Sequence, residues 1–302
     1  MGDRDSYRFL DLGQLRTFLA VYRAGSLTAA APLVGLSQPT VTTQLRALEE
    51  RMGRQLFERL PRGVAPTAVA DELAARLAGP MDELEAIAGG APDEPAPEPP
   101  VHLGGPAELM AVLALPALAP LIADGVRVRV TAGLADDLLA GLRAGRYDLV
   151  ISSIRPRGRA LRAEPLADEE FVLVAAPVWR DRLPPIEGPS ALAGVPLISY
   201  AEDLPILRRY WRRVFGARLA ADPAIVVPDL RAVKALAEAG AGATVLPRYL
   251  CADELASGGL VALLEPPEPP INTAYLAARA GSERLPHVAL VRQRLLRAGA
   301  DW

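Results

Sequence analysis

The sequence predicts an α/β protein in which a helical N-terminal part precedes a larger part of alternating strands and helices. Residues 12–67 carry apolar side chains at helical spacing together with a positive net charge. Residues 89–100 are rich in proline and acidic residues, which is typical of an extended, semi-rigid linker. From residue 101 onward, short β-branched runs alternate with helical patterns, which indicates parallel α/β construction.

Length and composition indicate a globular protein. The 302 residues suffice for two or three domains, and a chain with 51% hydrophobic and 23% charged residues is expected to fold. No apolar run is long enough to cross a bilayer, and no apolar leader follows Met1, so we expect a cytoplasmic protein. Cys251 is the single cysteine and cannot form an intramolecular disulfide, which agrees with a reducing compartment.

The charge is unevenly distributed along the chain. Residues 12–67 contain seven arginines and three glutamates, a net charge of +4, whereas the whole chain has −3, so the remainder has −7. A basic module joined to an acidic one is typical of a nucleic-acid-binding domain fused to a domain with another task.

Glycine and serine residues delimit three short helices near the N-terminus. Gly25 ends the first helix, and Ser26 is placed to cap the second. Gly35 forms a turn, and Ser37 is placed to cap a third helix. Two short helices joined by a glycine-containing turn predict a helix-turn-helix.

The third helix has one apolar side and one polar side. Its outward N-terminal end offers Gln38, Thr40, Thr43 and Arg46. Glutamine pairs with adenine in the major groove, threonine methyls contact thymine, and arginine reaches guanine or phosphate. The alternative is that this is an ordinary solvated helix face.

Residues 59–67 predict a small β-turn wing that follows the third helix. Its Arg59 and Arg62 are expected along the DNA backbone, where they would position the domain without reading sequence. The alternative is that both are ordinary surface charges.

Three segments closely resemble the DNA-binding domain of LysR-type transcriptional regulators. They are GSLTAAA at 25–31, LSQPTVTTQLRALE at 36–49 and GRQLFER at 53–59, and the similarity covers nearly every position from Leu12 to Thr67. The resemblance implies a winged helix-turn-helix whose recognition helix begins near Ser37. The DNA-binding residues expected from the helix geometry and the resemblance are Ser37, Gln38, Pro39, Thr40, Thr42, Thr43, Arg46, Arg59 and Arg62.

Residues 68–88 predict an amphipathic helix. Its apolar side chains recur at spacings of three and four, at Ala70, Leu73, Leu77, Leu84 and Ile87. They would either pack on the helix's own domain or form a dimer seam, as the linker helix of the family does, and we favour the seam. The Gly79–Pro80 pair is expected to bend or interrupt the helix. The resemblance implies a homodimer or a homotetramer.

The C-terminal part resembles the family's regulatory domain, which has the two-lobed fold of type 2 periplasmic solute-binding proteins. The matching segments are LRAGRYDL at 142–149, PLISY at 196–200 and AGAGATVLP at 239–247. Strands are expected at 101–103, 126–131, 149–152, 171–175, 198–200, 225–227, 244–246, 261–263 and 273–277. The expected domains are a winged helix-turn-helix (1–67), a linker and dimerisation helix (68–88), a proline-rich hinge (89–100) and a regulatory domain (101–302), with lobe I at 101–163 and 269–302 and lobe II at 164–268.

The resemblance implies a small-molecule effector, held between the two lobes, that modulates operator binding or activation. Ligands of open α/β sheets bind beyond the carboxyl ends of strands. The residues expected to bind the effector are therefore Gly105, Pro106, Ala107, Ser152, Ser153, Arg155, Ser199, Tyr200, Pro228 and Asp229. Because the segment from Gly105 to Ala107 lacks a hydroxyl group, the effector could be less polar, bind differently or be absent.

Nothing in the sequence indicates catalysis. The two histidines, His102 and His287, lie in separate segments, which argues against a metal cluster or a histidine-based triad. We therefore expect no enzyme activity, cofactor or metal. The expected partners are an operator in double-stranded DNA and a small-molecule effector, with RNA polymerase as a further candidate. The competing hypothesis is a small-molecule-binding protein or enzyme whose N-terminal module contacts only proteins.

Overall fold

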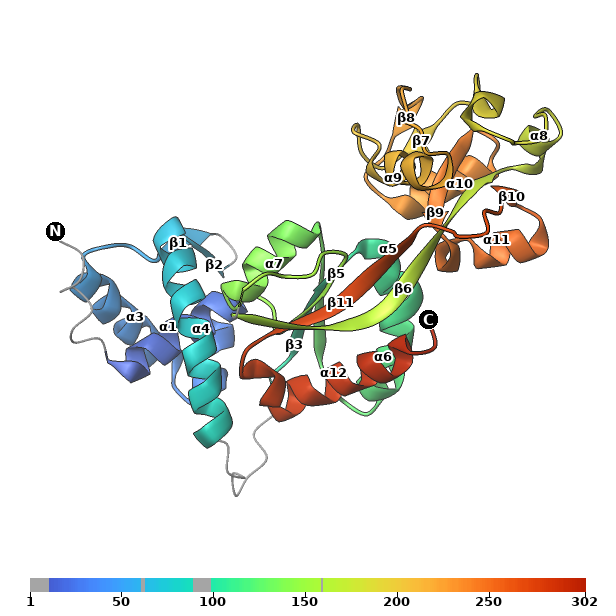
Figure 1. The fold of residues 1–302 in the computed structure, drawn as a ribbon. Helices are drawn as coiled ribbons and strands as arrows, with labels where there is room; N and C mark the ends of the chain where they lie inside the picture. The colour runs from blue at the N-terminus through green and yellow to red at the C-terminus, as the bar shows by residue number, and fades with distance from the viewer. Residues whose placement is uncertain (1–10, 61–62, 89–98, 159) are drawn as a thin grey trace. The chain divides into compact units, whose positions relative to one another are not determined.

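The computed structural model describes residues 11–60, 63–88, 99–158 and 160–302 (Figure 1). The chain divides into two compact units, each assembled from segments that are distant in sequence. The first unit comprises Met1–Gly105, Leu118–Glu164 and Tyr275–Leu296, and the second comprises Pro106–Ala117, Pro165–Ala274 and Arg297–Trp302.

The N-terminal helices begin and end where the sequence predicts. The Ser26 hydroxyl accepts a hydrogen bond from the Ala29 N–H, and the Ser37 hydroxyl accepts one from the Thr40 N–H. Gly25 and Gly35 follow the first two helices with φ of 61° and 70°, left-handed values that suit glycine. The helices are α1 (Leu12–Ala24), α2 (Leu27–Val34) and α3 (Gln38–Met52).

A short antiparallel hairpin follows α3. Its strands are β1 (Phe57–Leu60) and β2 (Gly63–Pro66), with Phe57 opposite Pro66. The Val64 N–H donates to the Gly25 carbonyl at 2.9 Å, so the hairpin is fastened to the end of α1. This hairpin is the predicted wing.

Helix α4 (Ala68–Ala88) runs through Pro80 without interruption. The predicted interruption is therefore wrong: proline removes only one N–H from the helix ladder, and the turns on either side continue it. Ala70 and Leu73 are buried in one core with α1 and α3. These two positions of the predicted dimer seam thus pack inside the chain, whereas Leu84 is 49% exposed.

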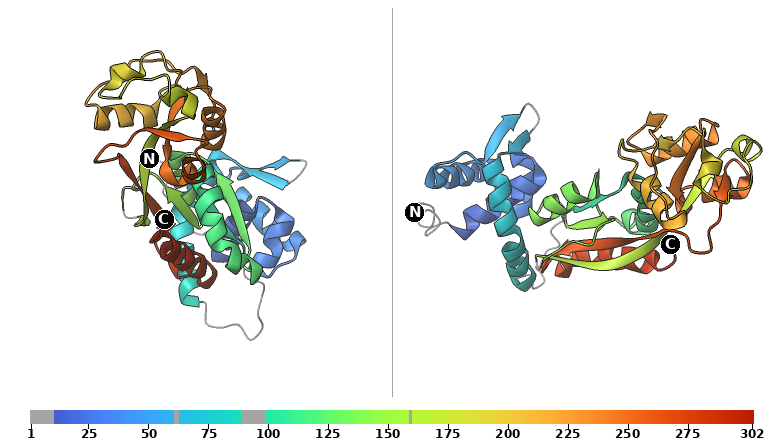
Figure 2. Two further views of the ribbon diagram at one scale, coloured as in Figure 1. Left: turned by 90° about the vertical axis from the view of Figure 1, so that its right-hand side faces the viewer. Right: turned by 45° about the horizontal axis from the view of Figure 1, so that its top comes forward.

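In the first unit a mixed sheet has the strand order β11-β5-β3-β4. Figure 2 shows this unit from two further sides, with its strands of residues 101–152 in green and its C-terminal helix in dark red. β3 pairs in parallel with both β4 and β5, whereas β5 pairs antiparallel with β11. The strands are β3 (Val101–Gly105), β4 (Val128–Ala132), β5 (Leu149–Ser152) and β11 (Ile271–Arg279). The helices around this sheet are α6 (Leu115–Ala123), α7 (Ala135–Arg143), η4 (Ser282–Arg284) and α12 (Pro286–Gly299), of which α6 and α12 extend into the second unit.

In the second unit β6 pairs antiparallel with both β9 and β10, and β7 pairs in parallel with β8. The strands are β6 (Leu161–Ala175), β7 (Ile198–Ser199), β8 (Ile225–Val226), β9 (Ala243–Pro247) and β10 (Val261–Leu264). The helices are α5 (Ala107–Leu109), η1 (Met110–Ala114), α8 (Pro177–Arg180), η2 (Pro189–Leu192), α9 (Pro205–Val214), α10 (Leu230–Glu238), η3 (Arg248–Leu250) and α11 (Ala252–Ser257).

Each of the nine predicted strands overlaps a strand of the structure, but the prediction of parallel construction is wrong in part. β6 and β11 are neighbours in the strand order, and each begins in one unit and ends in the other. β6 also begins at Leu161, ten residues before the predicted start. These strands introduce the antiparallel pairs. The pairs were not predicted, because apolar periodicity identifies a strand but not its direction.

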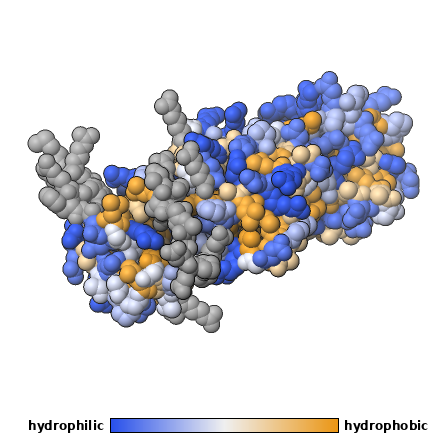
Figure 3. Space-filling view, turned by 90° about the horizontal axis from the view of Figure 1, so that it is seen from below, coloured by the Kyte–Doolittle hydropathy of each residue, from blue (hydrophilic) through white to orange (hydrophobic). Residues whose placement is uncertain are grey.

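The face in Figure 3 is largely polar, with patches of apolar side chains.

Candidate functional site

The N-terminal end of α3 presents an exposed polar edge, whereas the opposite side of the helix is apolar and buried. Val41 and Leu48 are fully buried, whereas the residues of the edge face solvent. The exposed residues are Ser37, Gln38, Pro39, Thr40, Thr43 and Arg46, and Thr42 is half-buried.

Hydrogen bonds within α3 fix several groups of this edge. The Gln38 side-chain amide donates to the Thr42 hydroxyl at 2.9 Å, and that hydroxyl donates to the Gln38 carbonyl at 3.0 Å. The Thr43 hydroxyl donates to the Pro39 carbonyl at 3.0 Å. Because both hydroxyl protons bond to the helix, the two threonines keep acceptor lone pairs for an outside partner.

The structure describes one of the two arginines that were predicted for the wing. Arg59 lies on β1, is exposed and stands opposite Val64 in the hairpin register. Arg62 lies outside the described residues. The exposed cation on β1 can thus meet a phosphate without rearrangement of the hairpin.

In the first unit, the predicted effector residues differ in exposure. Gly105 is buried at the end of β3, whereas Ser153 and Arg155 are exposed. Ser152 is fully buried, donates to the Ile154 carbonyl at 2.8 Å and accepts from the Ile154 N–H at 3.1 Å. Its hydroxyl closes the turn after β5.

In the second unit, Ser199 makes the same kind of turn after β7. Its hydroxyl donates to the Ala201 carbonyl at 2.8 Å and accepts from the Ala201 N–H at 3.2 Å. Pro106 and Ala107 at the start of α5 are half-buried, as is Tyr200, the pKa of whose phenol is raised by burial.

Asp229 caps α10 and faces Arg231, while Pro228 beside it is exposed. The carboxylate accepts from the Arg231 N–H at 2.9 Å and pairs with the Arg231 guanidinium at 2.7 Å. The hydrogen bond from this side chain lowers the pKa of Asp229. Much of the hydrogen-bonding capacity of Asp229 is therefore used within α10.

The sequence reasoning missed a set of carboxyl and phenol groups in the second unit. Glu169 is 8% exposed and accepts from the Tyr249 hydroxyl at 3.1 Å and from the Asn272 amide at 3.0 Å. Burial raises the pKa of Glu169 and of Glu108, and the charge of Glu169 adds to the effect on Glu108. Glu108 follows directly on Ala107, and this position beside the predicted effector residues could have identified Glu108 as a candidate from the sequence.

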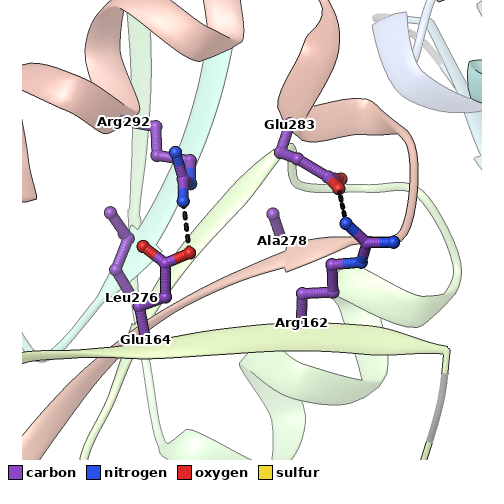
Figure 4. Close-up of a pocket in the computed structure, with 6 residues that line it drawn as sticks. All are labelled: Arg162, Glu164, Leu276, Ala278, Glu283 and Arg292. Carbon is purple, nitrogen blue, oxygen red and sulfur yellow. Dashed lines mark hydrogen bonds and ion pairs between the residues drawn. The ribbon is translucent and has the colours of Figure 1, made fainter.

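A small pocket in the first unit is lined by paired charges (Figure 4). Arg162 pairs with Glu283 at 2.8 Å, and Arg292 pairs with Glu164. The cavity holds about 70 Å³, whereas ligand pockets for metabolites hold about 300–1,000 Å³. The pocket therefore suits water or a small ion rather than an effector.

The described part of the chain offers neither a metal site nor a membrane-spanning helix. No group of three or more histidine, cysteine, aspartate or glutamate side chains there could hold a metal ion. None of its helices is both long and apolar enough to span a membrane.

Two family models match the chain. Residues 12–71 match the bacterial regulatory helix-turn-helix protein, lysR family, and residues 96–300 match the LysR substrate binding domain.

Curated relatives are similar along most of the chain. The HTH-type transcriptional regulator AbaB of Streptomyces antibioticus is 48% identical over 97% of this chain and 100% of its own length. The HTH-type transcriptional regulator PtxR of Pseudomonas aeruginosa is 31% identical over 89% of this chain and 88% of its own length.

Solved full-length structures share the fold at low identity. An OxyR variant of Pseudomonas aeruginosa has a TM-score of 0.74 at 20% identity, over 97% of this chain and 95% of its own. ArgP of Mycobacterium tuberculosis has a TM-score of 0.70 at 23% identity, over 97% of this chain and 98% of its own.

Proposed function

Since the chain belongs to the LysR family of transcriptional regulators, with a helix-turn-helix DNA-binding domain and an effector-binding domain, we propose that the exposed end of α3 reads the bases of its operator. The observation that carries this proposal is the polar edge of α3, which stays exposed while the opposite side of the helix is buried. An α-helix fits the major groove of B-DNA, where each base pair presents a distinct pattern of donors and acceptors.

The edge divides into reading and positioning residues. Gln38 can pair with adenine, and Thr43 offers an acceptor and a methyl group to the groove floor. Arg46 can reach guanine or phosphate, and Ser37, Pro39, Thr40 and Thr42 complete the contact surface. Arg59 and Arg62 of the wing are proposed to bind phosphates, which fixes the register of the domain but carries no sequence information.

Selection of bound sequences from random DNA tests this division. Replacing Gln38 by alanine should change the preferred base at particular positions, at a cost of about 1–3 kcal/mol for the original base pair. Gln293→Ala removes another exposed glutamine, from α12, and is the matched control, which should leave the selected sequence unchanged. Identical selected sequences for wild type and Gln38→Ala would contradict the reading role.

The effector contacts stay proposals, described for each unit by itself. In the first unit the exposed candidates are Ser153 and Arg155, and Gly105 offers its backbone. In the second unit the exposed candidate is Pro228, and the half-buried candidates are Pro106, Ala107, Tyr200 and Asp229. Ser152 and Ser199 support these contacts indirectly, because their hydroxyls hold the turns after β5 and β7.

Melting shifts against a panel of metabolites test the effector proposal. A ligand that binds the folded state raises the melting temperature, and the shift grows with the logarithm of the ligand concentration above its Kd. Arg155→Gln tests the contacts proposed for the first unit and Tyr200→Phe those proposed for the second. At least one of these variants should reduce the shift, whereas Gln293→Ala should not. A shift that neither variant changes would place the effector elsewhere.

We also propose a homodimer or homotetramer, because two modules bind the two half-sites of an operator. Strand β4 lies at the edge of its sheet, and Ile122, Val130 and Leu134 near it are 44%, 43% and 70% exposed. Such an edge favours association with a second copy. Sedimentation tests this surface, because Val130→Glu should dissociate into monomers at higher concentrations than the wild type does. Contact with RNA polymerase, a cytoplasmic location and the absence of enzyme activity are further parts of the proposal.

A further inference from the structure

A carboxylate on α4 is fully buried between two arginines that come from opposite ends of the chain. Asp82 has no exposed surface. One of its oxygens accepts from the Arg23 guanidinium of α1 at 2.6 Å, and the other accepts from the Arg279 guanidinium of β11 at 2.7 Å. A single side chain of α4 thus joins α1, a helix of the DNA-binding part, to a strand of the regulatory domain.

Arg279 is anchored in the regulatory domain by its remaining groups. It is 2% exposed and donates to the Leu142 carbonyl at 3.1 Å and to the Tyr147 carbonyl. It also lies 3.5 Å from Asp148, whose other oxygen accepts from the His102 N–H at 2.8 Å. The guanidinium therefore binds the loop after α7 and Asp82 at once.

Arg23 reaches the same loop from the other side. Its Nε donates to the Gly145 carbonyl at 3.3 Å. A Cβ added at Gly145 would lie 2.8 Å from the Cβ of Ala78, so the loop backbone is pressed against α4. Ala144 beside it is buried in the same apolar core as α1 and α3.

The charges of this cluster balance, since Arg23 and Arg279 face Asp82 and Asp148. Removal of one partner from a buried group of ions leaves the others uncompensated in a low-dielectric environment, which is strongly unfavourable. The cluster is therefore sensitive to the loss of any one member. This sensitivity distinguishes it from the exposed pair of Arg213 and Glu268, whose side chains are 58% and 79% exposed.

We propose that Arg23, Asp82, Asp148 and Arg279 form a charged joint through which the regulatory domain holds helices α1 and α4 of the DNA-binding part. Since α1 shares its apolar core with α3, a movement of β11 or of the loop after α7 is transmitted through the joint to the recognition helix. The role proposed for the joint is separate from the reading of bases by α3, and it does not depend on which DNA sequence is bound.

Distances between spin labels in the full-length chain test the joint. Cysteines replacing Thr28 on α2 and Asp136 on α7 lie at exposed positions of the two parts. The native Cys251 is fully buried and the pKa of its thiol is raised by burial to about 11, so labelling at neutral pH is directed to the introduced sites. An excess of unlabelled chain suppresses distances between copies.

The wild type should give one narrow distance distribution. Asp82→Asn should lose the single narrow peak, and so should Arg23→Gln, which leaves the pair of Asp82 and Arg279 in place. Glu268→Gln, which breaks the exposed pair, should keep the wild-type distribution. If Asp82→Asn does not fold, Arg23→Gln decides, and an unchanged narrow peak in that variant overturns the proposal.

Discussion

Replacement of Gly63 by alanine should displace the wing from α1. Gly63 has φ of 103°, a value that side-chain-bearing residues rarely adopt. A Cβ there would lie 2.4 Å from the Gly25 carbonyl oxygen, the same oxygen that accepts from the Val64 N–H at 2.9 Å. The added methyl therefore strains the backbone and also opposes the hydrogen bond that fastens the hairpin.

The expected loss follows from these two effects. Backbone held in a sparsely populated region costs about 1–3 kcal/mol for a residue with a Cβ. Loss of the bond between Val64 and Gly25 adds about 1 kcal/mol. We expect a total of about 2–4 kcal/mol.

Gly53→Ala is the matched control, because Gly53 also has a left-handed φ, 62°, but a Cβ there meets nothing within 4 Å. This variant should lose only about 1–2 kcal/mol. Thermal unfolding and hydrogen exchange at the Val64 amide measure both variants. If Gly63→Ala is as stable as Gly53→Ala, with Val64 equally protected, the proposed fastening of the wing is wrong.

Three further changes have defined outcomes. Ser37→Ala removes the cap of α3 and should lower the free energy of unfolding by about 1 kcal/mol, which denaturant titration measures. Gly79→Ala lies inside α4 with open space around the new Cβ, and should raise that free energy by about 0.5–1 kcal/mol. Glu108→Gln tests the raised pKa of Glu108. Because burial raises this pKa in the folded state, the stability linked to the neutral form is present below the unfolded pKa of about 4.3 and is lost as the pH rises through the folded value. The variant should thus be more stable than the wild type at pH 7 and equal to it near pH 3, and melting curves at both pH values show the difference.

The helix boundaries of the DNA-binding part could be predicted because they depend on local chemistry. Gly25 and Ser26 determine where α1 ends and α2 begins through backbone conformation and a single side-chain hydrogen bond. The polar edge of α3 follows in the same way from helical spacing, since Val41 is buried and Thr43, two residues further on, points to the opposite, exposed side.

Features that depend on distant partners could not be predicted. The directions of β6 and β11 depend on how the strands pair, which apolar spacing does not encode. Ser152 and Ser199 were expected to bind the effector, and the sequence did not show that each hydroxyl bonds to the residue two positions further along its own turn. The burial of Asp82 was not predicted, because its partners Arg23 and Arg279 are 59 and 197 residues away.

The salt dependence of operator binding tests most directly whether α3 reads bases while the wing binds phosphates. Arg59→Ala should weaken all DNA sequences alike and reduce the slope of log affinity against log salt by about 0.9, since one phosphate contact is lost. Gln38→Ala should keep the wild-type slope and lose affinity only for the preferred sequence. An unchanged slope for Arg59→Ala, or an equal loss on all sequences for Gln38→Ala, would contradict the assignment of roles.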